Sequence, residues 1–372
     1  MEFSNETQTL DLGPGVIAKA SVTGGPAFAL SATEWYAIQT YVANALALPT
    51  TETTFKTFLG NGAPDDLTPF KPLISAYSTI NEHVNVWQND TFPSSVSLAS
   101  DILNYAKQAA VYYNPILPLA QKLTQNPDDK ESKDALKAIL AVLSNSASEN
   151  QKKAKAVADK IKNFAVQTKA DQVVLNGSDG KGGLQKKYKD DYGSTSALVK
   201  QLNEEIAAQK IVLDAANAEY DYDKVVAATT PTYVWVWPFG TIAAGIVAGI
   251  YGDKAVKALQ RARAAQEQIN TMSAKVASNA LLIINITTSS SSISDILGKI
   301  EAALPVIQKI QGVWGAISDD LDNIVKTIDT NIGEALPIIM NLGVQTAINE
   351  WKDVGELAQA YRLYAFITVE SN

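Results

Sequence analysis

Residues 293–328 read ISDILGKIEAALPVIQKIQGVWGAISDDLDNIVKTI, and this stretch decides the fold class. Its apolar residues recur at alternating spacings of three and four, which is the a and d pattern of a coiled coil. Eleven positions keep this register without interruption: Ile293, Ile296, Ile300, Ala303, Ile307, Ile310, Trp314, Ile317, Leu321, Ile324 and Ile328. Fully helical, the stretch would be about 54 Å long. Pro305 lies off this coiled-coil seam, so we expect it to bend the helix instead of ending it.

Helical periodicity extends over most of the remaining chain. Ser31 and Glu34 form a capping-box pattern at the start of a helix that Pro49 would end. Further helices are predicted over 73–88, 94–125 (bent near Pro115 and Pro118), 132–175, 194–228 and 253–286, with two more after these. Because such lengths exceed those of ordinary globular helices, the predicted fold is all-α. We expect an elongated, coiled-coil-like bundle of about five long antiparallel helices.

The chain is predicted to have three parts. Residues 1–30 contain Gly13-Pro14-Gly15 and form an irregular N-terminal arm. Residues 31–224 and 253–372 together form the bundle, and residues 225–252 are an inserted head. Within the bundle, Thr287–Ser292 is a run of six hydroxyl residues, which are poor helix formers. This run is either a joint between two rods or a polar stretch of one continuous helix.

The segment between Lys224 and Asp253 does not fit a water-soluble bundle. It reads VVAATTPTYVWVWPFGTIAAGIVAGIYG and has no charged residue. From Tyr233 to Tyr251 the apolar character surrounds the whole helix circumference, and as one helix these residues would span about 28 Å, close to the hydrocarbon thickness of a bilayer. Tyr233, Trp235 and Trp237 lie at one end and Tyr251 at the other, as expected for aromatic rings at the lipid headgroup level.

Smaller features of this segment favour the same interpretation. Gly245 and Gly249 form a small-xxx-small motif, which allows helices to approach closely in lipid. Lys254, Lys257 and Arg261 follow at i, i+3 and i+7, so one helical face carries positive charges that could contact anionic headgroups. Pro238-Phe239-Gly240 interrupts the segment, with strand-like residues before the break and helix-like residues after it.

A re-entrant hairpin and a single straight span therefore both remain open, and so does the choice between strand and helix for 233–237. The predicted membrane-inserting residues are Tyr233, Val234, Trp235, Val236, Trp237, Pro238, Phe239, Gly240, Ile242, Ile246, Val247, Ile250 and Tyr251. The alternative is that the segment is a buried central helix of a soluble protein. The long amphipathic helices on both sides argue against this, because they offer no wide core to surround it.

Composition excludes several classes of protein. The 372 residues are 46% hydrophobic, which is ample for a folded core, and they include no cysteine and only one histidine, His83. A net charge of −8 argues against a nucleic-acid partner. No nucleotide-binding, metal-binding or triad motif occurs, so we expect no catalytic residue, cofactor or metal, and no enzyme activity. The opening residues MEFSNE lack the apolar core of a Sec signal peptide.

Two of these stretches resemble a known family. LSATEWYAIQTYVANALALPTT (30–51) is similar to the opening helix of the α-xenorhabdolysin A component and of the helical insecticidal crystal toxins. VIQKIQGVWGAISDDLDNIVKTI (306–328) is similar to their late coiled-coil helix, and an apolar segment with a central Pro/Gly break lies between the two motifs. These toxins belong to the cytolysin A-like superfamily of α-helical pore-forming toxins. The resemblance implies a five-helix bundle with a hydrophobic head hairpin and a ring pore, often built with a second protein component.

The leading hypothesis is therefore a pore-forming toxin component. It would be soluble as a monomer, released without a recognisable Sec signal, and active at the target cell membrane as a homo-oligomer or with a second toxin component. The alternative hypothesis is a non-lytic helical scaffold, in which the apolar segment forms a core or a dimer interface. Flotation with liposomes would distinguish the two.

Overall fold

The computed structural model describes residues 12–15, 32–192, 232–233, 248–364 and 368–369, together with scattered helical residues between 197 and 212. The chain divides into two compact units. Unit 1 comprises residues 1–31, 94–160 and 303–362, and unit 2 comprises residues 32–93, 161–302 and 363–372. Two long helices, α7 (Lys130–Asn176) and α12 (Ala274–Thr330), contribute residues to both units.

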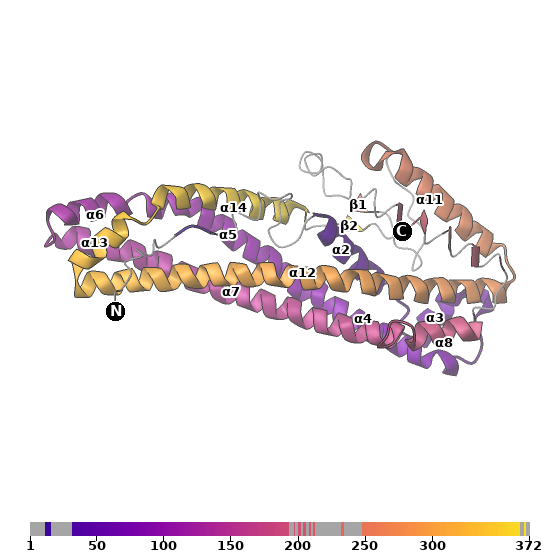
Figure 1. The fold of residues 1–372 in the computed structure, drawn as a ribbon. Helices are drawn as coiled ribbons and strands as arrows, with labels where there is room; N and C mark the ends of the chain where they lie inside the picture. Colours follow the sequence, from indigo (N-terminus) through magenta and orange to yellow (C-terminus); the bar gives the residue numbers. More distant parts are fainter. Residues whose placement is uncertain are drawn as a thin grey trace. The chain divides into compact units, whose positions relative to one another are not determined.

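Unit 1 is built from helices that bury one apolar stripe each. It contains α5 (Phe92–Tyr113), α6 (Ile116–Gln125), α13 (Ile332–Met340) and α14 (Val344–Tyr364), with its parts of α7 and α12. The short helices α6 and α13 pack against each other, as Figure 1 shows. Asn331 caps α13 by accepting a hydrogen bond from the backbone N–H of Glu334.

Aromatic side chains from three helices meet in the core of unit 1. The rings of Tyr105, Trp314 and Trp351 have centroids 4.6 to 4.8 Å apart in every pair. The N-terminal arm joins this cluster, because the Leu12 carbonyl oxygen accepts hydrogen bonds from the Tyr113 hydroxyl (2.9 Å) and from Trp351 Nε1 (2.8 Å). Leu12 is 1% exposed, so the described part of the arm is irregular but anchored.

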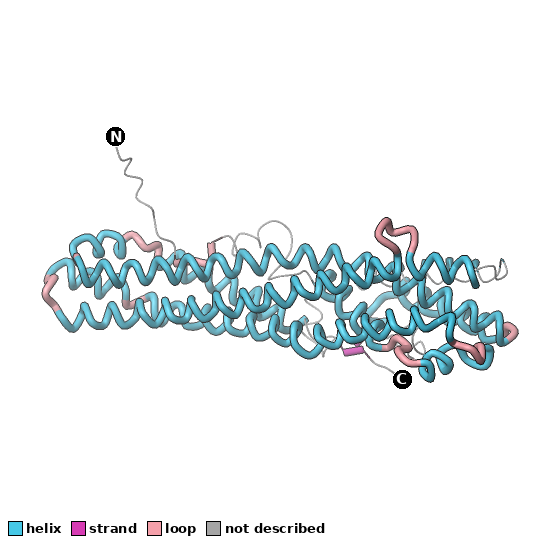
Figure 2. The backbone as a smooth tube through the Cα atoms, turned by 90° about the horizontal axis from the view of Figure 1, so that it is seen from below, coloured by secondary structure: helices cyan, strands magenta, loops and turns pink. Residues whose placement is uncertain are grey.

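Unit 2 begins with α2 (Ala32–Leu46) and α3 (Glu52–Leu59), followed by the short turns Gly60–Gly62 and Thr68–Phe70. α4 (Lys71–Val86) continues into a π-helical turn at Trp87–Thr91. α8 (Gly183–Tyr192), α11 (Ala248–Asn270) and the strands β1 (Thr232–Tyr233) and β2 (Thr368–Val369) complete the unit, with its parts of α7 and α12. Figure 2 shows that almost all of the described chain is helical.

The all-α fold predicted from the sequence is confirmed. The predicted helices over 73–88 and 132–175 correspond to α4 and α7. Pro305 lies inside α12 and does not end it. The joint considered at Thr287–Ser292 is absent, since α12 is continuous there and the alternative interpretation holds.

Three predictions about helix boundaries were wrong. Residues 94–125 form two helices, because the chain turns at Asn114 and Pro115. The helix predicted over 253–286 ends at Asn270, and α12 starts at Ala274. No helix was predicted between Pro49 and residue 73, but α3 and two helical turns lie there. The prediction for 194–228 falls mostly outside the described residues.

Candidate membrane-insertion element

The predicted membrane-inserting segment lies largely outside the described residues. Of its predicted residues, those outside are Val234, Trp235, Val236, Trp237, Pro238, Phe239, Gly240, Ile242, Gly245, Ile246 and Val247. Tyr233 belongs to β1, whereas Gly249, Ile250 and Tyr251 belong to the first turn of α11. The structure therefore describes the two ends of the segment, and these ends are a strand and a helix.

A two-stranded parallel pairing holds the N-terminal end. Thr232 of β1 is paired with Thr368 of β2, and Tyr233 with Val369. Sequence analysis did not predict this contact, because strands of two residues have no detectable period. Val369 is thus placed beside Tyr233, the residue at which the uncharged segment becomes fully apolar.

The C-terminal end continues into α11, which has one buried face and a basic exposed side. Ala258, Ala262, Ala265 and Ile269 are each at most 3% exposed and recur at helical spacing. Lys257 and Arg261, two of the three predicted headgroup contacts, are exposed. Lys254 lies on the same helix, three residues before Lys257. The small buried residues allow close packing of α11 within unit 2, while its positive charges remain accessible to solvent.

A tight contact fixes the turn between α11 and α12. A Cβ atom placed on Gly62 would lie 2.0 Å from the Ala274 carbonyl oxygen, so only glycine fits there. Ser278, one turn further along α12, donates a hydrogen bond of 2.6 Å to the Leu59 carbonyl oxygen. The chain at the end of α3 therefore packs tightly against the start of α12. α12 directly follows α11, the helix that carries the basic residues.

An aromatic cluster joins α3 and α8 in the same unit. Phe70 stacks on Tyr188 with ring centroids 5.7 Å apart and packs against Phe55 at 5.5 Å. The Tyr188 hydroxyl donates to the Pro69 carbonyl oxygen at 2.8 Å, and burial raises the pKa of Tyr188 to about 12. Partial burial also lowers the pKa of Lys189 on this helix. The cluster therefore packs α3 and α8 around Phe70.

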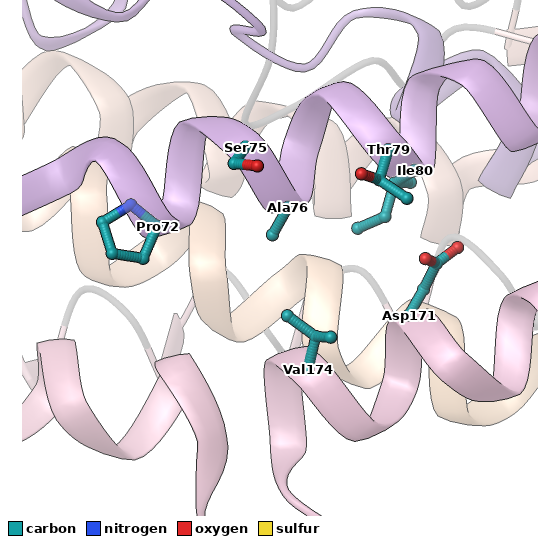
Figure 3. Close-up of a pocket in the computed structure, with 7 residues that line it drawn as sticks. All are labelled: Pro72, Ser75, Ala76, Thr79, Ile80, Asp171 and Val174. Carbon is teal, nitrogen blue, oxygen red and sulfur yellow. The ribbon is translucent and has the colours of Figure 1, made fainter.

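One small cavity lies between α4 and α7. Its volume is about 170 Å³, and Figure 3 shows its lining residues, Pro72, Ser75, Ala76, Thr79, Ile80, Asp171 and Val174. The carboxylate of Asp171, whose side chain is 5% exposed, is 2.8 Å from Nδ1 of His83. Burial raises the pKa of Asp171, and the bond to His83 opposes that rise. This pair links α4 and α7.

The described residues hold no group of histidine or acidic side chains that could bind a metal ion. Among them, α12 contains an 18-residue window with a mean hydropathy of 1.3, long and apolar enough by composition to cross a membrane. Because 61% of that window is buried, a soluble core helix explains it equally well. The predicted seam from Ile293 to Ile328 lies in this helix, and each of its eleven side chains is at most 2% exposed.

Comparisons with known proteins agree in both sequence and fold. Residues 34–211 match the family model of the Bacillus haemolytic enterotoxin (HBL). The chain is 25% identical to the pesticidal crystal protein Cry6Ba of Bacillus thuringiensis, in an alignment that covers 95% of this chain and 92% of that protein. The chain is thus similar in sequence to a haemolytic enterotoxin family over residues 34–211 and to a pesticidal crystal protein over almost its whole length.

Solved structures of toxin components share the fold of this chain. The HblL1 toxin component of Bacillus cereus has a TM-score of 0.54 at 18% identity, with 98% of this chain and all of that chain covered. Soluble SmhA of the tripartite α-pore-forming toxin Smh from Serratia marcescens has a TM-score of 0.57 at 13% identity, with 98% and 99% covered. The predicted resemblance is confirmed, and the relatives are toxins, not enzymes.

Proposed function

We propose that this protein is a component of a pore-forming toxin that is soluble until residues 225–252 enter a target membrane. The observation that carries the proposal is the uncharged stretch between Lys224 and Asp253, in a chain similar to a haemolytic enterotoxin family and to a pesticidal crystal protein. Transfer of each large apolar side chain from water to lipid contributes roughly 1.5–3 kcal/mol. Such a segment supplies more free energy than the few kcal/mol that separate folded from rearranged states of a typical domain.

The described ends of the segment support an insertion route. β1 and α11 flank it on either side, so the segment is attached to the rest of unit 2 through one strand and one helix. Lys254, Lys257 and Arg261 would contact anionic headgroups as the segment enters, and Gly245 and Gly249 would allow segments of neighbouring subunits to pack closely. The apolar seam of α12 would keep its helix contacts during assembly, either with further copies or with a second toxin component.

A leakage assay tests the insertion. We expect the protein, alone or mixed with a second component, to release dye from liposomes. Ile246→Asp/Val247→Asp should abolish leakage, because each charge at the bilayer centre costs about 2.5–3.5 kcal/mol. The matched control is Val111→Asp/Val166→Asp, which adds the same charges at valines that are 69% and 61% exposed. Equal leakage by the parent and the Ile246/Val247 variant would contradict the assignment of the segment.

Flotation with liposomes tests membrane binding apart from pore formation. Lys257→Glu/Arg261→Glu reverses two exposed charges, and it should weaken binding to anionic liposomes by roughly tenfold or more, since each basic residue near such a surface contributes about 1 kcal/mol. The effect should shrink as salt is raised. A parent protein that never floats with lipid would instead favour the non-lytic scaffold.

A further inference from the structure

The hydroxyl run Thr287–Ser292 has an unusual environment in unit 2. It lies within the continuous helix α12, yet several of its residues are not on the surface. Ser290 is 2% exposed, and Asn285, just before the run, is 0% exposed. A helix of this length normally buries apolar side chains where it contacts its neighbours. Here it buries hydroxyl and amide groups as well as apolar side chains such as Ile286.

Hydrogen bonds connect these residues to two other helices. The Tyr77 hydroxyl of α4 donates to Oδ1 of Asn285. Nδ2 of Asn176, the last residue of α7, donates to the Ser290 carbonyl oxygen at 3.1 Å and to Oγ of Ser294 at 3.0 Å. Tyr77, Asn176, Asn285, Thr287 and Ser290 therefore form a polar layer, in which α12 contacts α4 and α7 within about two helical turns.

The polar layer is incompletely paired. Within the described part of the chain, four of its buried atoms have no hydrogen-bond partner: Asn176 Oδ1, Asn285 Nδ2, Thr287 Oγ1 and Ser290 Oγ. Buried polar atoms normally find partners, and each one that does not destabilises the folded state. If α12 opened locally, these atoms would bind water, so opening here restores hydration that folding removed. The apolar seam of the same helix in unit 1 has less to gain, because among its described residues only Nε1 of Trp314 is buried without a partner.

We propose that the polar layer is the point at which α12 opens locally and parts from α4 and α7. Local unfolding starts where the packing stabilises the helix least. The biological role of this opening rests on the proposed function: opening at the polar layer precedes the release of residues 225–252. The buried polar atoms that lack hydrogen-bond partners thus lower the barrier to rearrangement of the soluble protein.

Hydrogen–deuterium exchange tests local opening in the full-length protein without any membrane. The variant Thr287→Val/Ser290→Ala removes two of the unpaired hydroxyls and keeps both hydrogen bonds of Asn176. The matched control, Thr288→Val/Ser291→Ala, makes the same substitutions at adjacent positions, of which Ser291 is exposed. In the parent, residues 281–294 should exchange faster than residues 307–321 of the same helix. In the polar-layer variant this exchange should slow by roughly tenfold, and its Tm should rise by several degrees, with little change in the control.

The opposite results overturn the proposal. Equal exchange in the two halves of α12, or equal slowing by variant and control, would show that the polar layer is not an opening point. In the leakage assay, the polar-layer variant should release dye roughly tenfold more slowly than the parent but to the same final extent. If the polar-layer variant exchanged more slowly but released dye as fast as the parent, opening at the polar layer would not precede release of residues 225–252, and that part of the proposal would be wrong. A parent that causes no leakage would contradict the proposed function, while the exchange data would still decide the opening point.

Discussion

Unit 1 and unit 2 hold their helices together with different side chains, although α12 contributes to both. In unit 1, the rings of Tyr105, Trp314 and Trp351 contact one another in every pair. In unit 2, Asp171 contacts His83 across α4 and α7, and the polar layer leaves four buried atoms unpaired. Buried aromatic rings stabilise a core strongly, whereas unpaired polar groups weaken it. We therefore expect unit 1 to persist and unit 2 to rearrange during the proposed membrane insertion.

The largest expected effect is in unit 1. Trp314→Ala removes a side chain that is 0% exposed and central to the aromatic cluster. Loss of such a side chain lowers the free energy of unfolding by about 3–5 kcal/mol, because it leaves a cavity. Urea titration followed by circular dichroism measures the change. Val111→Ala, at a valine that is 69% exposed, is the control and should change stability by less than about 0.5 kcal/mol. Similar losses in both variants would contradict a strongly packed unit 1.

A smaller loss is expected from Gly62→Ala in unit 2. The added methyl group would meet the Ala274 carbonyl oxygen at 2.0 Å and Oγ of Ser278 at 2.5 Å, so the turn must move away from α12. Overpacking of this kind lowers the free energy of unfolding by about 1–3 kcal/mol. Gly312→Ala is the opposite control, because that glycine lies inside α12 with no neighbouring atom within 4 Å. It should stabilise the protein by about 0.5–1 kcal/mol, as alanine favours helix.

The long helices could be predicted from sequence because their stability comes from a repeated local pattern. The seam from Ile293 to Ile328 places its side chains on one face whatever their partners are, and all are buried in the structure. α3 was missed because ETTFKTFL is short and rich in threonine, a poor helix former. Its stability depends on the capping box between Thr51 and Thr54 and on burial of Phe55 and Leu59.

Features that depend on distant contacts could not be predicted. The break between α11 and α12 has no proline or glycine, and it coincides with the close approach of Gly62 to Ala274. Asn176 donates a hydrogen bond to the Ser290 carbonyl oxygen within the hydroxyl run, and Tyr77 donates one to Asn285 just before the run; no local pattern places these residues side by side. At the candidate site, the uncharged segment and the basic residues after it were identified from composition. The pairing of β1 with β2 was not, and membrane insertion by residues 233–251 stays a prediction.

Alkaline pH should affect unit 2 through Tyr188. Burial raises its pKa in the folded protein to about 12, above the ordinary value of 10.0. The stabilising contribution of the protonated hydroxyl is therefore complete below pH 10 and lost as the pH rises toward 12. At neutral pH, Tyr188→Phe should lower the unfolding free energy by about 0.5–1.5 kcal/mol, because it removes the bond to Pro69. Tm measurements should show the two proteins converging above pH 10, and a constant difference would contradict this.

The smallest expected effect concerns Asp171. It distinguishes an ion pair between Asp171 and His83 from a neutral hydrogen bond between them. Burial raises the pKa of Asp171 above 3.8, so the folded state binds this proton more tightly than the unfolded state does. Its contribution to stability is complete below about pH 4 and lost as the pH rises through the raised value. Asp171→Asn cannot ionise but retains an oxygen that accepts a hydrogen bond from His83. The variant should therefore gain stability relative to the parent between pH 4 and 7, by less than about 1.4 kcal/mol for each unit of pKa difference. Urea titrations at each pH measure the gain, and Asp353→Asn, at an exposed position on α14, should show none. If Asp171→Asn lost stability throughout that pH range, the attraction between the ionised Asp171 carboxylate and His83 would outweigh the cost of burying that charge.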